Sequence, residues 1–214
     1  VLFRSGVVRE RLDELPWDEI DILHSHTLCE SLADGSTGLI DHVAKELGPY
    51  VGRVEAVNFG GGHFINKKGY DVDALIRAIR DFRSAFGVDV ILEPGSGIVV
   101  DAGYLVSTVL DIVHNKKDIA ILDASASCHM PDVLEVPYTP PLCGAAGPGI
   151  EPFTYILGGN TCMTGDIIGE YSFPRPLKPG DRLVFGDMLQ YSFVKNNNFN
   201  GTALPDLSLL HEDG

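Results

Sequence analysis

Several residues that could bind a small molecule each follow a short apolar segment of the sequence. They are His26, the run Gly60-Gly61-Gly62, and Glu93. Consecutive glycines expose backbone N–H groups with no side chain in the way, which suits a phosphate, although a tight turn between a strand and a helix would need them equally. A glycine run, an imidazole and a carboxylate in equivalent positions indicate a ligand site at the ends of strands.

Two histidines raise the alternative of a metal site. His24 and His26 lie two residues apart, with Cys29 close behind. Histidines at this spacing on one face of a strand can bind zinc, but no matching carboxylate or cysteine pair completes a ligand set in the sequence. We therefore expect no metal, and stacking or hydrogen bonding by His26 is the preferred interpretation. His63, directly after the glycines, is as compatible with packing or solvent exposure as with function.

A further candidate lies late in the chain. Cys162 occupies a segment rich in turn residues that ends at Asp166. A lone cysteine is usually a small buried hydrophobe. A reactive thiol in a polar loop flanked by glycine is the alternative, and the residues alone leave both interpretations open.

The first half of the chain must position these groups by alternating strands and helices. Apolar runs predict buried strands, and apolar residues at helical spacing predict helices. The strands are expected at 20–24, 54–59 and 88–92, and the helices at 34–47 and 71–86. This order is typical of a parallel β/α architecture, in which chemistry is located at the carboxyl ends of the strands.

The pattern changes at residue 104. Residues 105–113 and 119–123 read as two strands joined by a turn, which predicts a hairpin, and short strands and turns follow. We therefore predict two domains, an α/β domain in residues 1–103 and a β-rich domain in residues 104–214.

Composition excludes several classes of partner. Acidic residues outnumber basic ones by 30 to 16, giving a net charge of −14, and no basic stripe is present, so we expect no nucleic acid. No apolar stretch is long enough to span a membrane. The four cysteines form no Cys-x-x-Cys pair and follow no signal peptide, which favours a cytoplasmic location. The chain lacks an initiator Met, and both ends look cut.

The motifs taken together resemble those of one family. They are HTLCE at 26–30, NFGGGH at 58–63, EPGSG at 93–97, DASA at 123–126, HMPDVLEVPY at 129–138, TC with GD at 161–166, and NG at 200–201. Their order resembles that of carboxynorspermidine (carboxyspermidine) decarboxylases, and the match spans nearly the whole chain. Single motifs also occur in ornithine and diaminopimelate decarboxylases, but HTLCE and HMPDV are more specific to this family.

The resemblance implies a fold, a cofactor and a reaction. The fold would be α/β plus β, with the C-terminal part of a pyridoxal-phosphate-binding (β/α)8 TIM barrel followed by a β-rich barrel or sandwich domain. The cofactor would be pyridoxal 5′-phosphate. The reaction would be decarboxylation of carboxynorspermidine or carboxyspermidine to norspermidine or spermidine, so the substrate would be a cationic polyamine.

The resemblance also implies roles for the strand-end residues. His26 would stack on the cofactor ring, and Gly60, Gly61 and Gly62 would hold its phosphate. Glu93 would contact the pyridine nitrogen and keep the ring an effective electron sink.

Residues of the second half would complete the site. Tyr191 would close the phosphate site, and Cys162 would deliver or orient the proton that replaces the carboxylate. Asp132, Glu135 and Asp166 are candidates for holding the substrate's amines. In this family type the loop with Cys162 reaches into the partner subunit's site, so the resemblance implies a homodimer with shared active sites.

The sequence departs from the family pattern at three points. Ser96 stands where related decarboxylases often have Arg, and Met163 stands where they have an acid. The lysine that forms the Schiff base lies on an early barrel strand in this family, and none of the chain's lysines has that context. We therefore expect the 214-residue chain to be inactive by itself.

Alternatives remain open at this stage. The chain could belong to a related ornithine or diaminopimelate decarboxylase, to a racemase, or to a regulatory binding protein without catalysis on the same scaffold. Sequence upstream of this chain would separate the last of these, because a lysine on the first barrel strand supports an enzyme.

Overall fold

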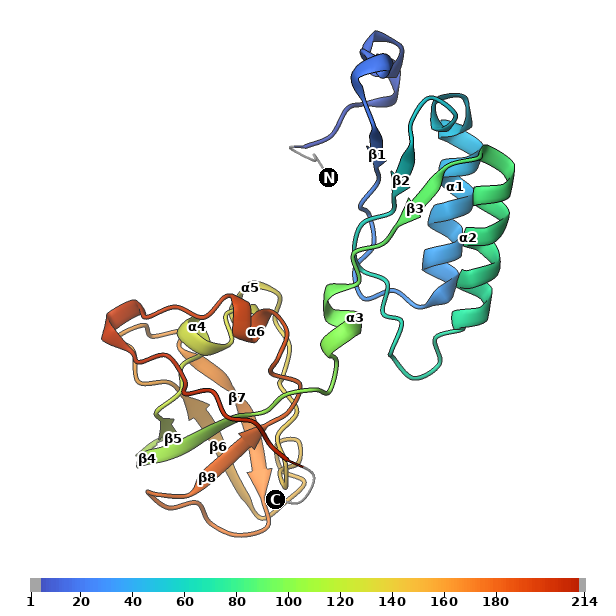
Figure 1. Cartoon of the computed structure of the whole chain (residues 1–214). Coiled ribbons are helices and arrows are strands. Elements are labelled where there is room, and N and C mark those ends of the chain that lie inside the picture. Colours follow the sequence, from blue (N-terminus) through green and yellow to red (C-terminus); the bar gives the residue numbers. More distant parts are fainter. Residues whose placement is uncertain (1–4, 212–214) are drawn as a thin grey trace. The chain divides into compact units, whose positions relative to one another are not determined.

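The structure is a computed structural model that describes residues 5–211. It divides into two compact units, the first ending at Ile98 and the second beginning at Val99. Figure 1 shows the strands and helices of both units. The division falls five residues before the change of pattern at residue 104.

The first unit is built on a parallel sheet with the order β1-β2-β3. Leu23 pairs with Val57, and Val57 with Val90, so the three strands run in register. The elements in chain order are η1 (Arg9–Glu14), η2 (Trp17–Glu19), β1 (Ile22–His24), α1 (Ala33–Val51), β2 (Ala56–Asn58), α2 (Val72–Phe86) and β3 (Asp89–Ile91), and the short helix α3 (Gly95–Val99) ends at the first residue of the second unit. The predicted order of strands and helices is confirmed, and each strand is shorter than its apolar run.

Helix α2 has clear signals at both ends. The Asp71 carboxylate accepts a hydrogen bond from the N–H of Ala74 at 2.8 Å, which caps the first turn. Gly87 ends the helix in the left-handed region with φ 70°, where glycine carries no steric penalty. Leu75 and Phe82 are its buried residues, on the face that the sequence predicted to be apolar.

Helix α1 continues beyond the predicted end at residue 47. It runs through Pro49 to Val51, and Val51 is fully buried. Tyr50 stacks on Trp17 with ring centroids 5.0 Å apart and donates a hydrogen bond to Asp13 at 2.7 Å. Packing of this last turn therefore outweighs the proline that its sequence contains.

The second unit is dominated by a curled sheet with the order β7-β6-β5-β4-β8. Its elements are β4 (Leu105–Asn115), β5 (Lys117–Leu122), α4 (Ala126–His129), α5 (Asp132–Glu135), β6 (Phe153–Gly158), β7 (Ile167–Phe173), β8 (Arg182–Phe185), α6 (Tyr191–Val194) and η3 (Phe199–Gly201). The predicted hairpin is confirmed as the antiparallel pair β4 and β5, with Lys116 at φ 64° in its turn. The helices α4, α5 and α6 have four residues each, too few to show a period in the sequence.

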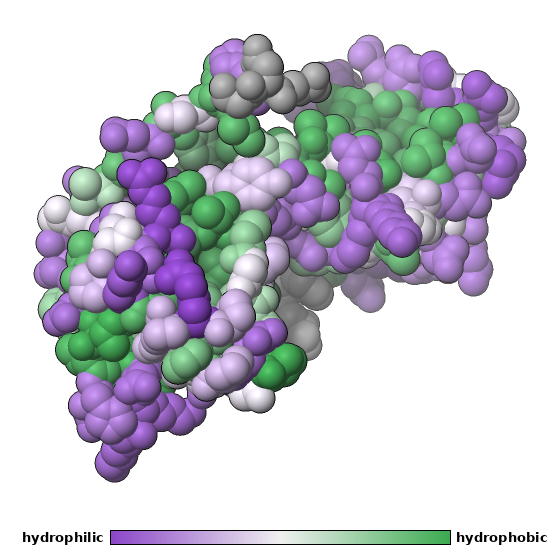
Figure 2. All heavy atoms as spheres, turned by 90° about the horizontal axis from the view of Figure 1, so that it is seen from below, coloured by the Kyte–Doolittle hydropathy of each residue, from purple (hydrophilic) through white to green (hydrophobic). Residues whose placement is uncertain are grey.

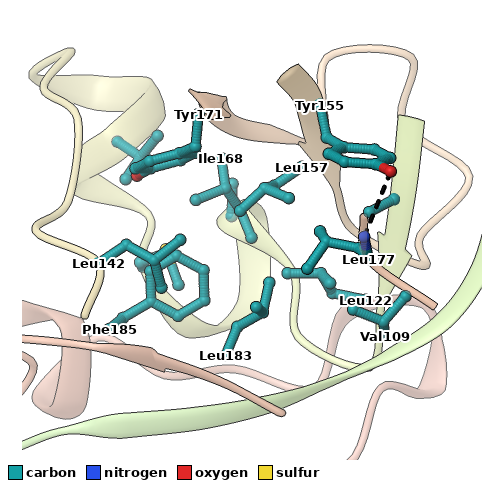
Figure 3. Packing of buried hydrophobic residues seen from close by; sticks show 14 of the residues in the cluster. Val109, Leu122, Leu142, Tyr155, Leu157, Ile168, Tyr171, Leu177, Leu183 and Phe185 are labelled. Atoms are coloured by element: carbon teal, nitrogen blue, oxygen red, sulfur yellow. Dashed lines mark hydrogen bonds between the residues drawn. The ribbon is translucent and has the colours of Figure 1, made fainter. Parts of the chain in front are cut away.

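One hydrophobic cluster joins the strands of the second unit, as Figure 3 shows. Leu157 and Phe185 are fully buried in it. The polar ends of its tyrosines are satisfied, because the Tyr171 hydroxyl donates to the carbonyl of Pro140 at 2.8 Å and the Tyr155 hydroxyl accepts from the N–H of Leu177 at 3.3 Å. Burial raises the pKa of Tyr171, so this hydroxyl keeps its proton and its hydrogen bond.

The surface mixes apolar and polar residues, which are interspersed on the face shown in Figure 2. The C-terminal segment contributes exposed leucines, including Leu207, which is 74% exposed. Among the helices of residues 5–211, none combines the length and the apolar character that a bilayer crossing requires.

The buried cluster gives a stability prediction. Leu157→Ala should lower the free energy of unfolding of the second unit by about 2–5 kcal/mol, because it leaves a cavity among buried side chains. Leu207→Ala is the matched control and should change it by less than about 0.5 kcal/mol. Urea unfolding of both variants measures the difference, and equal effects would contradict the assignment of the core.

Candidate active site

The carboxyl ends of β1, β2 and β3 lie at one edge of the first sheet because the strands are parallel. The loops that follow them carry His26, the glycine run and Glu93. A Cβ atom added at Gly61 would lie 3.3 Å from the His26 ring and 2.9 Å from the Glu93 carbonyl oxygen. The structure therefore brings together the strand-end residues that the sequence singled out.

The glycine loop, residues 60–62, has no room for side chains. Gly60 and Gly62 have φ values of 69° and 84°, in the left-handed region. A Cβ at Gly60 would lie 2.5 Å from Cγ of His26, and a Cβ at Gly62 would lie 2.3 Å from the carbonyl oxygen of Leu28. These glycines are required by conformation and by close approach, so the loop is a tight turn, and its binding of a phosphate stays a prediction.

Glu93 is held from two directions. Its N–H donates to the carbonyl of Gly60 at 2.8 Å, and its Oε1 accepts from Nδ2 of Asn58 at 2.7 Å. The carboxylate is half-exposed, and its Oε2 lies 3.9 Å from Nε2 of His24. The acid is thus fixed by the chain while one oxygen stays accessible.

The structure supplies the carboxylate that the sequence did not place beside the two histidines. His24, His26 and Glu93 each offer a ligand atom, and these atoms lie within 4.8 Å of one another. The rings of His24 and His26 are tilted, with centroids 5.8 Å apart. All three side chains are exposed, and the expected absence of a metal stays a prediction.

His63 directly follows the glycine loop and contacts Ser36 and Phe59. It is buried, with Nδ1 2.9 Å from Oγ of Ser36 and Nε2 3.4 Å from the carbonyl oxygen of Phe59. The Tyr70 hydroxyl donates to the same Ser36 oxygen at 2.7 Å. Burial lowers the pKa of His63. Of the interpretations that the sequence left open for His63, the structure favours packing.

Cys162 lies exposed in the loop between β6 and β7 of the second unit, and this loop is tied down by Asp166. Asp166 is buried, and its Oδ2 accepts from the hydroxyl of Thr161 at 2.6 Å. Its Oδ1 accepts from the N–H of Ala126 at 2.8 Å and from the hydroxyl of Ser125 at 3.0 Å. Both oxygens of Asp166 are therefore used inside the chain.

Asp132 and Glu135 are also paired within the chain. The ammonium of Lys195 donates to Oδ1 of Asp132 at 2.5 Å and to Oε2 of Glu135. These contacts raise the pKa of Lys195, the hydrogen bond to Asp132 most of all, followed by that to Glu135. Tyr191, on α6, is 58% exposed, and its ring centroid lies 6.0 Å from the same ammonium. No pattern in the sequence indicated this pairing.

Comparison with known proteins identifies the family. The model of the family described as "Pyridoxal-dependent decarboxylase, C-terminal sheet domain" matches residues 18–188. The chain belongs to the pyridoxal-dependent decarboxylases. The α/β part with a parallel sheet and the following β-rich part are the fold that the sequence predicted.

Individual relatives within this family are similar to most of the chain. It is 42% identical to the carboxynorspermidine/carboxyspermidine decarboxylase of Campylobacter jejuni over 97% of this chain and 57% of the relative. It is 41% identical to the carboxyaminopropylagmatine decarboxylase of Synechocystis over 89% of this chain and 50% of the relative. The crystal structure of the Campylobacter jejuni carboxynorspermidine decarboxylase complexed with norspermidine has a TM-score of 0.87 at 42% identity, over 95% of this chain and 58% of that one. The chain spans about half the length of these relatives.

The strand-end residues fit the cofactor of this family. Only glycine lets the backbone of the glycine loop pack so closely against His26, Leu28 and the Glu93 carbonyl, and it leaves no side chain over the backbone N–H groups that a phosphate would need. The His26 ring lies against Gly61, and Glu93 presents a half-exposed carboxylate at the same edge. None of the chain's lysines lies in β1, β2 or β3.

The close approach at the glycine loop gives a second prediction. Gly62→Ala should lower the free energy of unfolding by about 1–3 kcal/mol, because alanine is strained at this φ and its Cβ would meet the Leu28 carbonyl. Gly38→Ala is the control, since Gly38 lies inside α1 with open space around it, and it should raise stability by about 0.5–1 kcal/mol. Urea unfolding measures both, and a Gly62→Ala protein as stable as the Gly38→Ala control would contradict the geometry.

Proposed function

We propose that the protein containing this chain uses pyridoxal phosphate to decarboxylate carboxynorspermidine or carboxyspermidine. The observation that carries this proposal is the cluster of His26, the glycine loop and Glu93 at one sheet edge, in a chain 42% identical to such a decarboxylase. Carboxyaminopropylagmatine is a second candidate substrate, favoured by the 41% identity to the Synechocystis relative. All three substrate names denote a carboxylated polyamine or agmatine.

The residues of the first unit would bind and orient the cofactor. When bound, pyridoxal phosphate supplies an electron sink that lets the substrate's carboxylate leave as carbon dioxide. The N–H groups of Gly61 and Gly62 would bind the phosphate, since that of Gly60 already donates to Asn58, and the imidazole of His26 would pack on the ring. The carboxylate of Glu93 would face the ring nitrogen and favour its protonated form.

The second unit would supply the proton and recognise the substrate. Cys162 is exposed, and its thiol would deliver or orient the proton that replaces the carboxylate. Tyr191 is also exposed and would close the phosphate site. Asp166 was a candidate amine ligand, but its internal hydrogen bonds support a different role, that of an anchor for the Cys162 loop.

Asp132 and Glu135 remain the proposed amine site. Their carboxylates already hold one ammonium, that of Lys195, which supports their ability to bind a primary amine. A substrate amine would share the two carboxylates with Lys195 or displace it. Two acids facing one lysine leave one negative charge unbalanced, which favours a further cation.

The homodimer with shared sites is part of the proposal. Cys162 belongs to the second unit, while the glycine loop and Glu93 belong to the first. In the family that the sequence resembles, the cysteine loop serves the partner subunit's cofactor. A regulatory protein without catalysis on the same scaffold is the alternative.

Activity of the complete protein tests the function. Expressed from its complete reading frame and supplied with the cofactor, it should release carbon dioxide from carboxynorspermidine, and Glu93→Ala should lower kcat/KM at least about a hundredfold because the ring nitrogen loses its carboxylate. Cys143→Ala, which removes another exposed thiol, is the control and should leave the rate unchanged. A complete protein that binds the cofactor but releases no carbon dioxide from any of the three substrates would support the regulatory alternative.

Mixing two inactive variants tests the shared site. Full-length Glu93→Ala and Cys162→Ala should each be nearly inactive. After subunit exchange, about half of the dimers are mixed, and each mixed dimer has one site with both groups intact, so activity should return to roughly a quarter of wild type. If exchange is demonstrated by mass and no activity returns, Glu93 and Cys162 act within one chain.

A further inference from the structure

Asn58 lies between the glycine loop and Glu93 and contacts both. We infer that Asn58 is a positioning residue that orients the Glu93 carboxylate toward the cofactor's ring nitrogen and links this carboxylate to the glycine loop. This inference rests on the proposed function. Asn58 is the last residue of β2, two positions before Gly60. Its type and position in the sequence predict no role for it.

The orientation of the Asn58 amide follows from its partners. The N–H of Gly60 can only donate, so the atom 2.8 Å from it is the amide oxygen, Oδ1. The amide nitrogen, Nδ2, must then face the other way, and it donates to Oε1 of Glu93 at 2.7 Å. A flipped amide would place two acceptors against each other at Glu93 and two donors against each other at Gly60.

This contact removes the main freedom of the Glu93 side chain. The terminal torsion of a glutamate is broad, and a half-exposed carboxylate would otherwise rotate against water. Asn58 occupies Oε1, whereas Oε2 lies 3.9 Å from Nε2 of His24. One oxygen is thus held by the chain, and the other is left to meet a ligand.

Asn58 is itself rigidly placed. Its carbonyl accepts from the N–H of Ser25 at 2.8 Å, and the N–H of Glu93 donates to the carbonyl of Gly60 at 2.8 Å. The Asn58 side chain therefore closes a ring of hydrogen bonds through Gly60 and Glu93. Any shift of the glycine loop would therefore move the carboxylate of Glu93 through these hydrogen bonds.

A pair of ligands separates positioning from a general structural role. The first is 4′-deoxypyridoxine 5′-phosphate, which has the ring nitrogen and the phosphate but no aldehyde. The second is its analogue with a C–H group in place of the ring nitrogen. Calorimetry on the complete apoprotein gives a Kd for each ligand. The Kd of the C–H analogue divided by the Kd of the first ligand is a ratio that reports the contact at the ring nitrogen alone.

Asn58→Ala should lower this ratio about tenfold, toward the ratio measured for Glu93→Ala. In a protein that already carries Glu93→Ala, adding Asn58→Ala should change the ratio little. Asn58→Ser, whose hydroxyl can still accept from Gly60, should show the same loss and guards against misfolding of the alanine variant. Ser25→Ala is the matched control, because it removes a polar side chain at the same sheet edge, and it should leave the ratio unchanged.

The possible outcomes are distinct. A variant that weakens both ligands equally, with an unchanged ratio, has only a structural defect and overturns the inference for Asn58. A wild-type protein that binds neither ligand overturns the proposed function itself. A ratio that falls in Asn58→Ala even when Glu93 is absent would mean that Asn58 acts on the ring directly and not through the carboxylate.

Discussion

The backbone at the glycine loop approaches its neighbours more closely than any side chain would allow, and the candidate site depends on this approach. The missing Cβ atoms of Gly60, Gly61 and Gly62 would overlap with the loops that follow β1 and β3. All three strand ends are therefore in direct contact through backbone and imidazole. Because the strands are parallel and in register, the packing of one loop sets the position of the other two.

In the second unit, the buried side chain of Asp166 holds the loop that carries Cys162. Asp166 gathers hydrogen bonds from the loop that carries Cys162 and from the start of α4, where Ser125 is the cap. A buried carboxylate is tolerated only when its oxygens are satisfied, and here N–H and O–H donors surround both. A Cβ at Gly159 would lie 2.2 Å from Oδ2 of Asp166, so the loop also closes against the acid. The thiol of Cys162 stays exposed while its loop is held.

The sequence predicted what periodicity and motif order can carry. The alternation of strands and helices, the hairpin of β4 and β5 and the gathering of Glu93 with the glycine loop follow from local patterns and from the geometry of parallel sheets. The end of α1 was wrong by four residues because packing of Tyr50 and Val51 prevails over the local signal of Pro49.

Contacts between residues far apart in the chain could not be predicted from the sequence. Asn58 and Glu93 are 35 positions apart, and Lys195 and Asp132 are 63 apart, so no local spacing links them. Asp166 was a candidate for holding the substrate's amines, and its hydrogen bonds to Ser125 and Ala126 were not foreseen because these residues lie 41 and 40 positions away, at the start of a helix too short to predict.

The burial of His63 links the glycine loop to proton uptake. Its lowered pKa means that the folded chain binds a proton at this ring only at a lower pH than the unfolded chain does. As the pH falls below the ordinary histidine value of 6.5, the unfolded chain holds more protons, and the free energy of unfolding decreases until the pH reaches the pKa of the folded state. Above pH 6.5 the ring is neutral in both states and contributes no such slope. The buried residue that follows the glycine loop therefore makes the folded chain more stable at neutral pH than at acidic pH.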